Sequence, residues 1–224
     1  MSLPLGPAVD SWPRPLPARE KMQGGRVVLE PLHRRHGAEL AEAADGADES
    51  FTYMSCGPFP TRADMNNFIA QNTARLDMAF WAVRPLVTGR ASGFLALLDI
   101  APHHATIELG CIWFSPELQR TRAATEAMFL LLRHAADELG YRRLVWKCDN
   151  LNDASKRAAQ RLGFVHEGTL RAHKVVKGRA RDSAIFSITA EEWPARRDAM
   201  IAWLAAENFD EAGNALRPLA SFRG

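Results

Sequence analysis

Hydrophobic and polar positions change their period along the chain in a way that predicts strands alternating with helices. Residues 105–114 and 141–148 form short apolar runs with β-branched and aromatic members, which is typical of strands. Between them, apolar residues recur at helical spacing through 125–139 and make a stripe wide enough to pack on a sheet. The stretch from Glu108 to Phe164 therefore reads strand, tight loop, helix, strand, polar loop, helix.

The same kind of pattern covers most of the remaining chain. Thr61 is expected to cap a helix, because threonine accepts hydrogen bonds from the first amides of a helix. Further strands are expected at 26–31, 80–87, 92–100, 164–171 and 183–188, and further helices at 36–44, 61–75, 153–162 and 191–207. This order predicts an α/β or α+β fold with a mixed sheet, not a doubly wound dinucleotide fold.

Both ends of the chain differ from its middle. Five prolines fall within residues 1–25, so this segment is expected to be an arm that Trp12 and Leu16 could anchor. We expect one domain over 26–190, followed by a C-terminal helix and a tail over 191–224. The apolar side of that helix, with Met200, Trp203 and Leu204, could cover the sheet or mediate a homodimer.

Composition narrows the classes of function. A net charge of +2 demands neither nucleic acid nor an anionic membrane as a partner. The three cysteines are scattered without metal spacing and read as reduced thiols, and no apolar run reaches membrane-spanning length, so a cytoplasmic protein without a metal is expected. The excess of positive charge is partly local: Arg171, His173, Lys174, Lys177, Arg179 and Arg181 cluster.

The loop at 115–124 is a candidate anion site. It runs from a strand into the helix that we expect to begin near Thr125, so several backbone N–H groups converge at a helix N-terminus. Unpaired amides and the helix dipole both favour phosphate there. Arg120 and Arg122 add positive charge at the same place.

This loop resembles the pyrophosphate loop of the GNAT acetyltransferases, which reads Gln or Arg, two residues, Gly, one residue, then Gly or Ala. The segment 119–124 fits at Gln119 and Ala124 and departs at Arg122, where the family usually has glycine. Further resemblance, to the Rim-type branch, comes from Ala124-Thr-Glu-Ala127, Asn152-x-x-Ser155, Leu162-Gly-Phe164 and Glu167-Gly168. The resemblance spans 26–194, and its motifs fall on the expected elements.

The resemblance implies a curved sheet of about seven strands that splays apart near its middle, with acetyl-CoA as co-substrate in the splay. It also implies a set of residues that contact acetyl-CoA: Ile112, Phe114, Gln119, Arg120, Thr121, Arg122, Ala123, Ala124, Thr125, Asn152 and Ser155. Ile112 and Phe114 would contribute backbone groups. Arg122 could form a direct phosphate pair in place of the close approach that glycine permits.

Glu108 and Ser155 are the catalytic candidates. Glu108 lies in mid-strand at a spacing to Gln119 that resembles the catalytic glutamate of several GNAT enzymes, and it could act as a base through a water; alternatively it is solvated or paired with an arginine. Ser155 could face the thiol sulfur, while Asn152 or Ser155 could instead cap a helix. The two tyrosines, Tyr53 and Tyr141, lie outside these motifs, which leaves no general acid assigned.

The sequence thus predicts direct acetyl transfer from acetyl-CoA to a primary amine in a ternary complex. The acceptor could be a protein N-terminus or a small amine, and the basic segment is a hint toward an acidic acceptor. Asp182 could orient the amine or pair with Arg179 or Arg181. The alternatives are a non-catalytic acyl-CoA-binding module, which Arg122 and the missing tyrosine acid favour, and a transferase of a longer acyl group.

Overall fold

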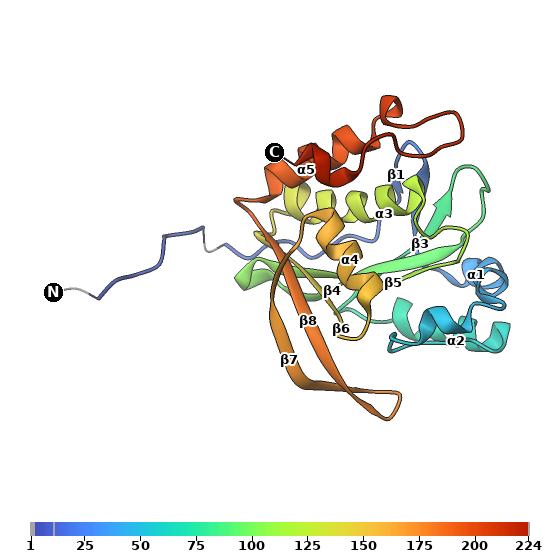
Figure 1. The fold of residues 1–224 in the computed structure, drawn as a ribbon. Helices are drawn as coiled ribbons and strands as arrows, with labels where there is room; N and C mark the ends of the chain where they lie inside the picture. Colours follow the sequence, from blue (N-terminus) through green and yellow to red (C-terminus); the bar gives the residue numbers. More distant parts are fainter. Residues whose placement is uncertain (1–2, 11, 224) are drawn as a thin grey trace.

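One open sheet of eight strands forms the centre of the computed structural model, which describes residues 3–10 and 12–223 (Figure 1). The strands run in the spatial order β1-β2-β3-β4-β5-β6-β8-β7, and all neighbours are antiparallel except β5 and β6. Their bounds are β1 (Met22–Gln23), β2 (Val27–Pro31), β3 (Ala79–Pro85), β4 (Gly93–Ala101), β5 (Thr106–Phe114), β6 (Arg143–Asp149), β7 (Val165–Val176) and β8 (Arg179–Thr189).

Helices cover both faces of this sheet. The α-helices are α1 (Gly37–Ala44), α2 (Arg62–Thr73), α3 (Arg122–Arg133), α4 (Asp153–Leu162) and α5 (Trp193–Leu204). A π-helical turn, His134–Glu138, extends α3, and short 3-10 turns lie at Arg34–His36, Asp48–Phe51, Pro102–His104, Ala206–Asn208 and Leu219–Phe222. Residues of α1 and α2 share one apolar core with the sheet, and residues of α3, α4 and α5 share the other.

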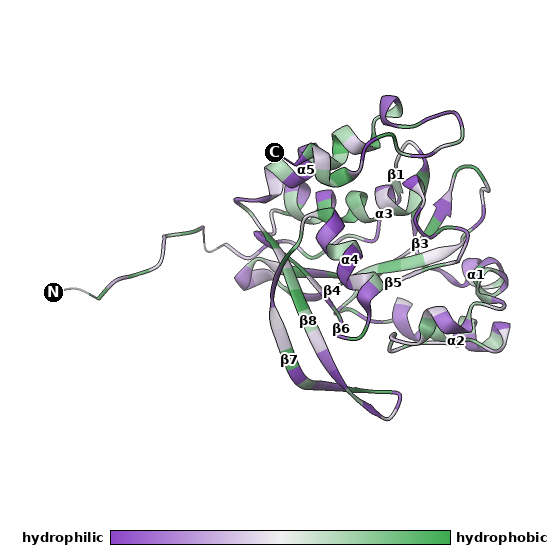
Figure 2. Cartoon of the chain, viewed as in Figure 1, coloured by the Kyte–Doolittle hydropathy of each residue, from purple (hydrophilic) through white to green (hydrophobic). Residues whose placement is uncertain are grey.

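The central strands are apolar on both sides because both sides are covered. In β3, Trp81 and Val83 belong to the core beneath α3, whereas Phe80 and Ala82 belong to the core beneath α1 and α2. This two-sided burial explains why the strand reads as a continuous apolar run and not as an alternating one. Figure 2 shows hydrophobic residues along the central strands and hydrophilic residues on outer helix surfaces.

The sheet splits between β5 and β6. These parallel strands pair only from Thr106 to Glu108, although both continue beyond that point. Past the split, β5 has a bulge in which Cys111 adopts a left-handed backbone with φ of 47°, and two residues of β5 face one residue of β4. The expected splay of the central strands is therefore present. In the described part of the chain, it leaves one edge of β5 and one edge of β6 without a strand partner past the split.

The N-terminal arm departs from the prediction in two ways. Met22 and Gln23 pair with β2, which adds an eighth strand to the seven expected. Trp12 and Leu16 are 78% and 62% exposed, so their predicted anchoring role is wrong. Backbone carbonyls hold the arm instead: Tyr141 Oη donates to Pro15 O at 3.1 Å and Trp81 Nε1 donates to Glu20 O at 2.8 Å. Residues 1, 2 and 11 of the arm lie outside the described residues.

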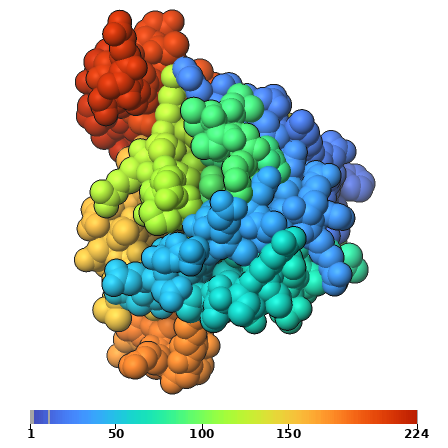
Figure 3. Space-filling model, turned by 90° about the vertical axis from the view of Figure 1, so that its right-hand side faces the viewer, coloured from blue at the N-terminus to red at the C-terminus, as the bar shows by residue number. Residues whose placement is uncertain are grey.

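The C-terminal segment is part of the fold. Met200 and Trp203 of α5 are buried against the domain itself, where α5 packs on α3. The expectation of a simple tail is wrong for the described part, because Leu219 is only 2% exposed and Arg223 Nη1 donates to Gln160 O at 2.8 Å. In Figure 3 the C-terminal residues form a lobe on the domain, at the opposite end from the β7–β8 hairpin. Residue 224 is outside the described range.

No helix among the described residues combines the length and the apolar character needed to cross a membrane.

Candidate active site

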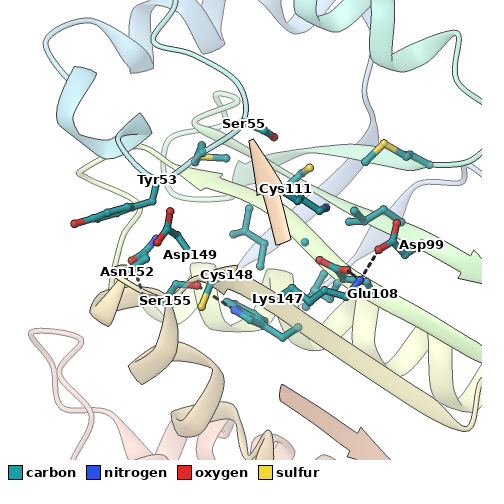
Figure 4. A pocket seen from close by; sticks show the side chains of 18 of the residues that line it. Tyr53, Ser55, Asp99, Glu108, Cys111, Lys147, Cys148, Asp149, Asn152 and Ser155 are labelled. Atoms are coloured by element: carbon teal, nitrogen blue, oxygen red, sulfur yellow. Dashed lines mark hydrogen bonds and ion pairs between the residues drawn. The ribbon is translucent and has the colours of Figure 1, made fainter. Parts of the chain in front are cut away.

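A pocket of about 300 Å³ lies where β5 and β6 separate. Its walls come from β4, β5 and β6, from the start of α4, from residues 53–55 and from the β7–β8 hairpin. Figure 4 shows that Glu108, Lys147 and Asp99 lie together on one side of Cys148, with Ser155, Asn152 and Asp149 on the other. The fold therefore brings both predicted catalytic residues, Glu108 and Ser155, to one pocket.

Glu108 is a buried carboxylate with a lysine partner. It is 6% exposed, and its Oε2 lies 2.8 Å from Lys147 Nζ. Burial raises the pKa of Glu108 to about 7, although attraction to Lys147 opposes that rise. The alternatives of a solvated carboxylate or an arginine pair are wrong. A carboxyl with this pKa is partly ionised near neutral pH, as a general base requires.

Sequence reasoning missed Lys147 and Asp99. Lys147 Nζ also pairs with Asp99, whose backbone is left-handed with φ of 45°. Asp99 is the single charged residue of the apolar strand β4, which was a usable signal, whereas Lys147 shares β6 with Arg143 and Asp149 and stands out less. The two strands that carry them lie on opposite sides of β5, so their contact with Glu108 depends on the sheet order.

Ser155 and Asn152 begin α4 beside the pocket. Asn152 is the helix cap, since its Oδ1 accepts a hydrogen bond from Ser155 N at 3.0 Å. Ser155 Oγ accepts from Trp146 Nε1 at 3.0 Å, which leaves its own hydroxyl hydrogen available to another acceptor. Asn152 thus performs the capping role, and the Ser155 hydroxyl lines the pocket.

Tyr53 and two thiols also line this pocket. Tyr53 lies outside the acetyltransferase motifs of the sequence, yet the 3-10 turn Asp48–Phe51 and the loop after it bring it beside Asn152 and Asp149 (Figure 4). Burial raises the pKa of Cys111 to about 11 and also raises the pKa of Cys148. Both thiols are therefore protonated near neutral pH and are poor nucleophiles.

The loop before α3 presents unpaired amides. The helix begins at Arg122, three residues earlier than expected, because Thr121 caps it by accepting from Ala124 N at 3.1 Å. The left-handed position is Arg120, with φ of 62°, so residue 122 has no need of glycine's freedom. Within the described residues, the backbone N–H groups of Arg120, Arg122 and Ala123 have no acceptor. These amides can hold an anion at the helix N-terminus.

Side chains around this loop make contacts within the protein. Arg122 donates to Leu204 O, and its guanidinium lies 4.1 Å from the centroid of the Phe209 ring. Gln119 Nε2 donates to Phe114 O at 3.0 Å, which closes the loop against the end of β5. Arg161 of α4 donates to Thr125 Oγ1 at 2.7 Å, so α4 ties the loop to the pocket side.

The remaining predicted residues near the loop fall into two groups. Ile112 lines the pocket, beyond the last pair between β5 and β6. Phe114 and Ala124 are buried in the core, so only their backbones could meet a ligand.

A second pocket of about 450 Å³ adjoins the first. The two share Ser55, Arg75, Met78 and Cys111, and the second is otherwise lined by polar and aromatic side chains of α2 and the preceding loop. Each pocket is larger than a single acetyl group, and the two lie on either side of these shared residues. No group of three or more histidine, cysteine or carboxylate side chains in the described part of the chain is arranged to hold a metal ion.

Comparisons with known proteins agree with this geometry. Residues 26–165 match the family model described as Acetyltransferase (GNAT) domain. A GCN5-related N-acetyltransferase from Brucella melitensis is 44% identical, with 95% of this chain and 97% of that chain covered and a TM-score of 0.92. A probable GNAT acetyltransferase from Chromobacterium violaceum is 41% identical, with 86% and 98% covered and a TM-score of 0.80.

A more distant likeness comes from Bacillus subtilis strain 168. Its protein YdaF, named provisionally as a ribosomal N-acetyltransferase, is 27% identical over 108 residues. This match covers 48% of the present chain and 58% of the length of YdaF.

Proposed function

Since the chain belongs to the GNAT acetyltransferase family, we propose that it transfers an acetyl group from acetyl-CoA directly to a primary amine. Members of this family use acetyl-CoA as the acetyl donor. The observation that carries the proposal is the split between β5 and β6, with a buried carboxylate on one side and a serine hydroxyl on the other.

Two features suit acetyl-CoA. The unpaired amides of Arg120, Arg122 and Ala123 suit the pyrophosphate, because an anion at a helix start satisfies amides that otherwise lack acceptors. Beyond Glu108, no described strand pairs with β5 on its β6 side, so the backbone of β5 can pair with the amides of the pantetheine arm. The thioester would then lie near Asn152 and Ser155, where the pocket begins.

Glu108 is the proposed general base. The attacking amine must lose a proton as its nitrogen bonds to the thioester carbonyl carbon, and Glu108 takes that proton through a water. The tetrahedral intermediate then collapses and the carbon–sulfur bond breaks, so the products are an N-acetylated amine and the thiolate of CoA, which takes up a proton from water. Lys147 holds the Glu108 carboxylate in place during this sequence.

Ser155 is the proposed hydrogen-bond donor to the leaving sulfur. Trp146 Nε1 already donates to Ser155 Oγ, so the serine hydroxyl hydrogen is directed elsewhere, and the departing thiolate is a suitable acceptor. The pocket thiols Cys111 and Cys148 are poor candidates for a covalent acetyl-enzyme, because their raised pKa values keep them protonated. This favours direct transfer in a ternary complex.

The acceptor that we propose is a protein N-terminus or a small primary amine. The two adjoining pockets offer room for more than an amino group, and the likeness to YdaF is consistent with a Rim-type acceptor. A homodimer and a cytoplasmic location stay predictions from the sequence.

The test is calorimetric titration with acetyl-CoA, followed by thiol release against a panel of amines and N-terminal peptides. Binding with amine-dependent thiol release is the expected result. Binding of acetyl-CoA without thiol release on any acceptor would show that the protein is a non-catalytic acyl-CoA-binding module and not an enzyme. Faster release from longer acyl-CoA donors would reassign the donor.

A further inference from the structure

Two cations of the β7–β8 hairpin line the same pocket as Glu108. Lys174 is on β7 and Arg181 is on β8, and both contribute to the pocket wall. The hairpin projects from the body of the molecule in Figure 1, yet its tip is held in place, since Lys177 Nζ donates to Phe51 O at 2.7 Å. That contact fixes the hairpin against the chain segment that leads to Tyr53 on the pocket rim.

The register places the two cations directly opposite each other. Lys174 pairs with Arg181, so both side chains are on the same face of the hairpin. Just before this pair, β7 bulges: three of its residues face only Asp182, Ala172 is left-handed with φ of 48°, and Asp182 Oδ1 accepts from Ala172 N at 2.7 Å. The Asp182 carboxylate thus stabilises the bulge. Neither predicted ion pair, of Asp182 with Arg179 or with Arg181, forms among the described residues.

Most other charged side chains of the pocket form ion pairs and Asp149 accepts from Leu151 N, whereas these two cations have no partner among the described residues. Arg75 pairs with Asp77, and Lys147 pairs with Glu108 and Asp99. Within residues 3–10 and 12–223, neither Lys174 nor Arg181 forms an ion pair or a side-chain hydrogen bond, and Arg181 Nε is buried without an acceptor. Like charges at facing positions of a sheet repel, and a buried donor without an acceptor is unfavourable. An anion between them would satisfy both.

The positive charge of these cations also affects the pKa of the neighbouring His173. The pKa of His173 is lowered, first by burial and then by repulsion from Lys174, Lys147 and Arg181. Positive charge is therefore concentrated on this wall of the pocket. The proposed function places the pyrophosphate of CoA at the start of α3, so this wall of the pocket is left for the acceptor.

We propose that Lys174 and Arg181 form an anion subsite that selects acceptor amines carrying a carboxylate or a phosphate group. This inference rests on the proposed function, because it assigns the substrate class of the same pocket. At about 300 Å³, the pocket accommodates an acceptor portion about the size of a dipeptide, with its amine toward Glu108 and its anion toward the hairpin. An N-terminal peptide with an acidic second residue and a small phosphorylated amine both have this chemistry.

Matched acceptor pairs test the subsite. The carboxylate pair is Ser-Asp-amide and Ser-Asn-amide, and the phosphate pair is phosphoethanolamine and ethanolamine. We expect the anionic member of at least one pair to have a kcat/KM about tenfold or more above its neutral counterpart. The pair that discriminates identifies the source of the anion. Equal kcat/KM values within both pairs would overturn the subsite while leaving acetyl transfer intact.

Variants assign the preference to the two cations. Arg181→Met and Lys174→Met should each remove most of the preference by lowering kcat/KM for the anionic acceptor alone. Arg179→Met is the matched control, since Arg179 lies on the same hairpin, is exposed and does not line the pocket. An equal loss for anionic and neutral acceptors in the Arg181 and Lys174 variants would show a structural role and overturn the subsite.

A binding measurement separates this inference from the proposed function. The Nε–H resonance of Arg181, assigned by its absence in Arg181→Met, is followed by NMR during titration with N-acetyl-Ser-Asp-amide and with N-acetylphosphoethanolamine. A saturable shift with either ligand, absent with N-acetyl-Ser-Asn-amide, supports the subsite even if no amine is acetylated. No shift with either anionic ligand would overturn the subsite whether or not the protein acetylates amines.

Discussion

A carboxyl group enclosed by three neighbouring strands has a higher pKa than one in water, and Glu108 is such a group. Burial penalises its charged form and raises the pKa to about 7, while Lys147 limits that rise. Cys111 of β5, Asp99 of β4 and Lys174 of the β7–β8 hairpin are further titratable groups that line the same pocket. The charge of Glu108 near neutral pH therefore depends on its burial and on two residues distant in the sequence, Lys147 and Asp99.

The pH profile tests Glu108 as the base. The ionised form accepts the proton, so kcat/KM should rise as pH rises through about 7 and then level off. Glu108→Gln should lower kcat by about 10² to 10⁴ and remove this rise, with little change in acetyl-CoA affinity. Steady-state rates between pH 5.5 and 9 provide the measurement, and an unchanged profile in the variant would exclude Glu108 as the base.

The same residue has an effect on stability with a definite sign. Because its pKa is higher in the folded protein than in the unfolded chain, the favourable contribution of protonated Glu108 is fully present at low pH and is lost as pH rises through about 7. Denaturant unfolding of the wild type and Glu108→Gln should show the wild type losing stability relative to the variant as pH rises from about 4.5 to about 7. A constant difference between the two would contradict the raised pKa.

Lys147 is the residue that should move the pH profile without removing the base. Lys147→Met removes the attraction that favours ionised Glu108, so the pH at which activity rises should become higher. Lys147→Arg keeps a cation and should restore much of the original profile. If Lys147→Met lowered activity equally at every pH, the ion pair would serve the fold and not the proton transfer.

Among the elements, the first turn of α3 gives the backbone amide and the side chain of Arg122 different roles. Thr121 places the start of the helix at Arg122, where the amide is unpaired and the guanidinium turns toward Leu204 and Phe209. The substitution of arginine for the family's usual glycine is therefore compatible with the loop. Its side chain docks the C-terminal segment, and its amide stays available.

Two substitutions at this position distinguish these roles. Arg122→Ala removes the side chain and should lower the free energy of unfolding by about 1–2 kcal/mol with little effect on acetyl-CoA affinity. Arg122→Pro also removes the amide hydrogen at a position where proline suits a helix, after a residue with ψ of 163°, and should weaken acetyl-CoA about tenfold or more.

Calorimetry with acetyl-CoA measures both variants, and circular dichroism confirms that each is folded. Equal affinities for the alanine and proline variants would show that the amide does not bind phosphate. A large loss in Arg122→Ala without a loss of stability would instead make the guanidinium a phosphate ligand.

On the scale of the whole molecule, the C-terminal segment completes the core on the α3 face. The ring of Phe209 meets Trp203 at a centroid distance of 5.1 Å, and Leu219 packs into the main core cluster. These contacts bring residues more than a dozen positions beyond α5 back onto the domain. The segment thus contributes to the stability of the fold that holds the site.

Two leucines in this segment provide a matched comparison. Leu219→Ala should lower the free energy of unfolding by about 2–5 kcal/mol, because that side chain is 2% exposed. Leu216→Ala should change it by less than about 0.5 kcal/mol, because Leu216 is 63% exposed. Urea unfolding measures both changes in the free energy of unfolding. Similar changes for the two variants would show that the segment does not pack into the core.

Local pattern alone located most elements because periodicity is a property of neighbouring residues. The helix at 153–162 was predicted with its observed bounds, since Asn152 caps it and Gly163 ends it with a left-handed backbone. The strand at β1 was missed because two residues carry no period. The end of the chain was misread because a few scattered apolar residues acquire meaning only from the surface that they meet.

The sequence by itself determined the order of most strands and helices, the loop before α3 as a candidate anion site and the candidacy of Glu108 and Ser155, because these depend on spacing along one segment. Only the tertiary structure decided that Lys147 and Asp99 meet Glu108, that Tyr53 enters the pocket and that Arg122 turns to the C-terminal segment. It also decided that Lys174 faces Arg181 with no ion-pair partner among the described residues. These contacts join strands and loops that are distant in the chain, and strand order, bulges and burial fix them.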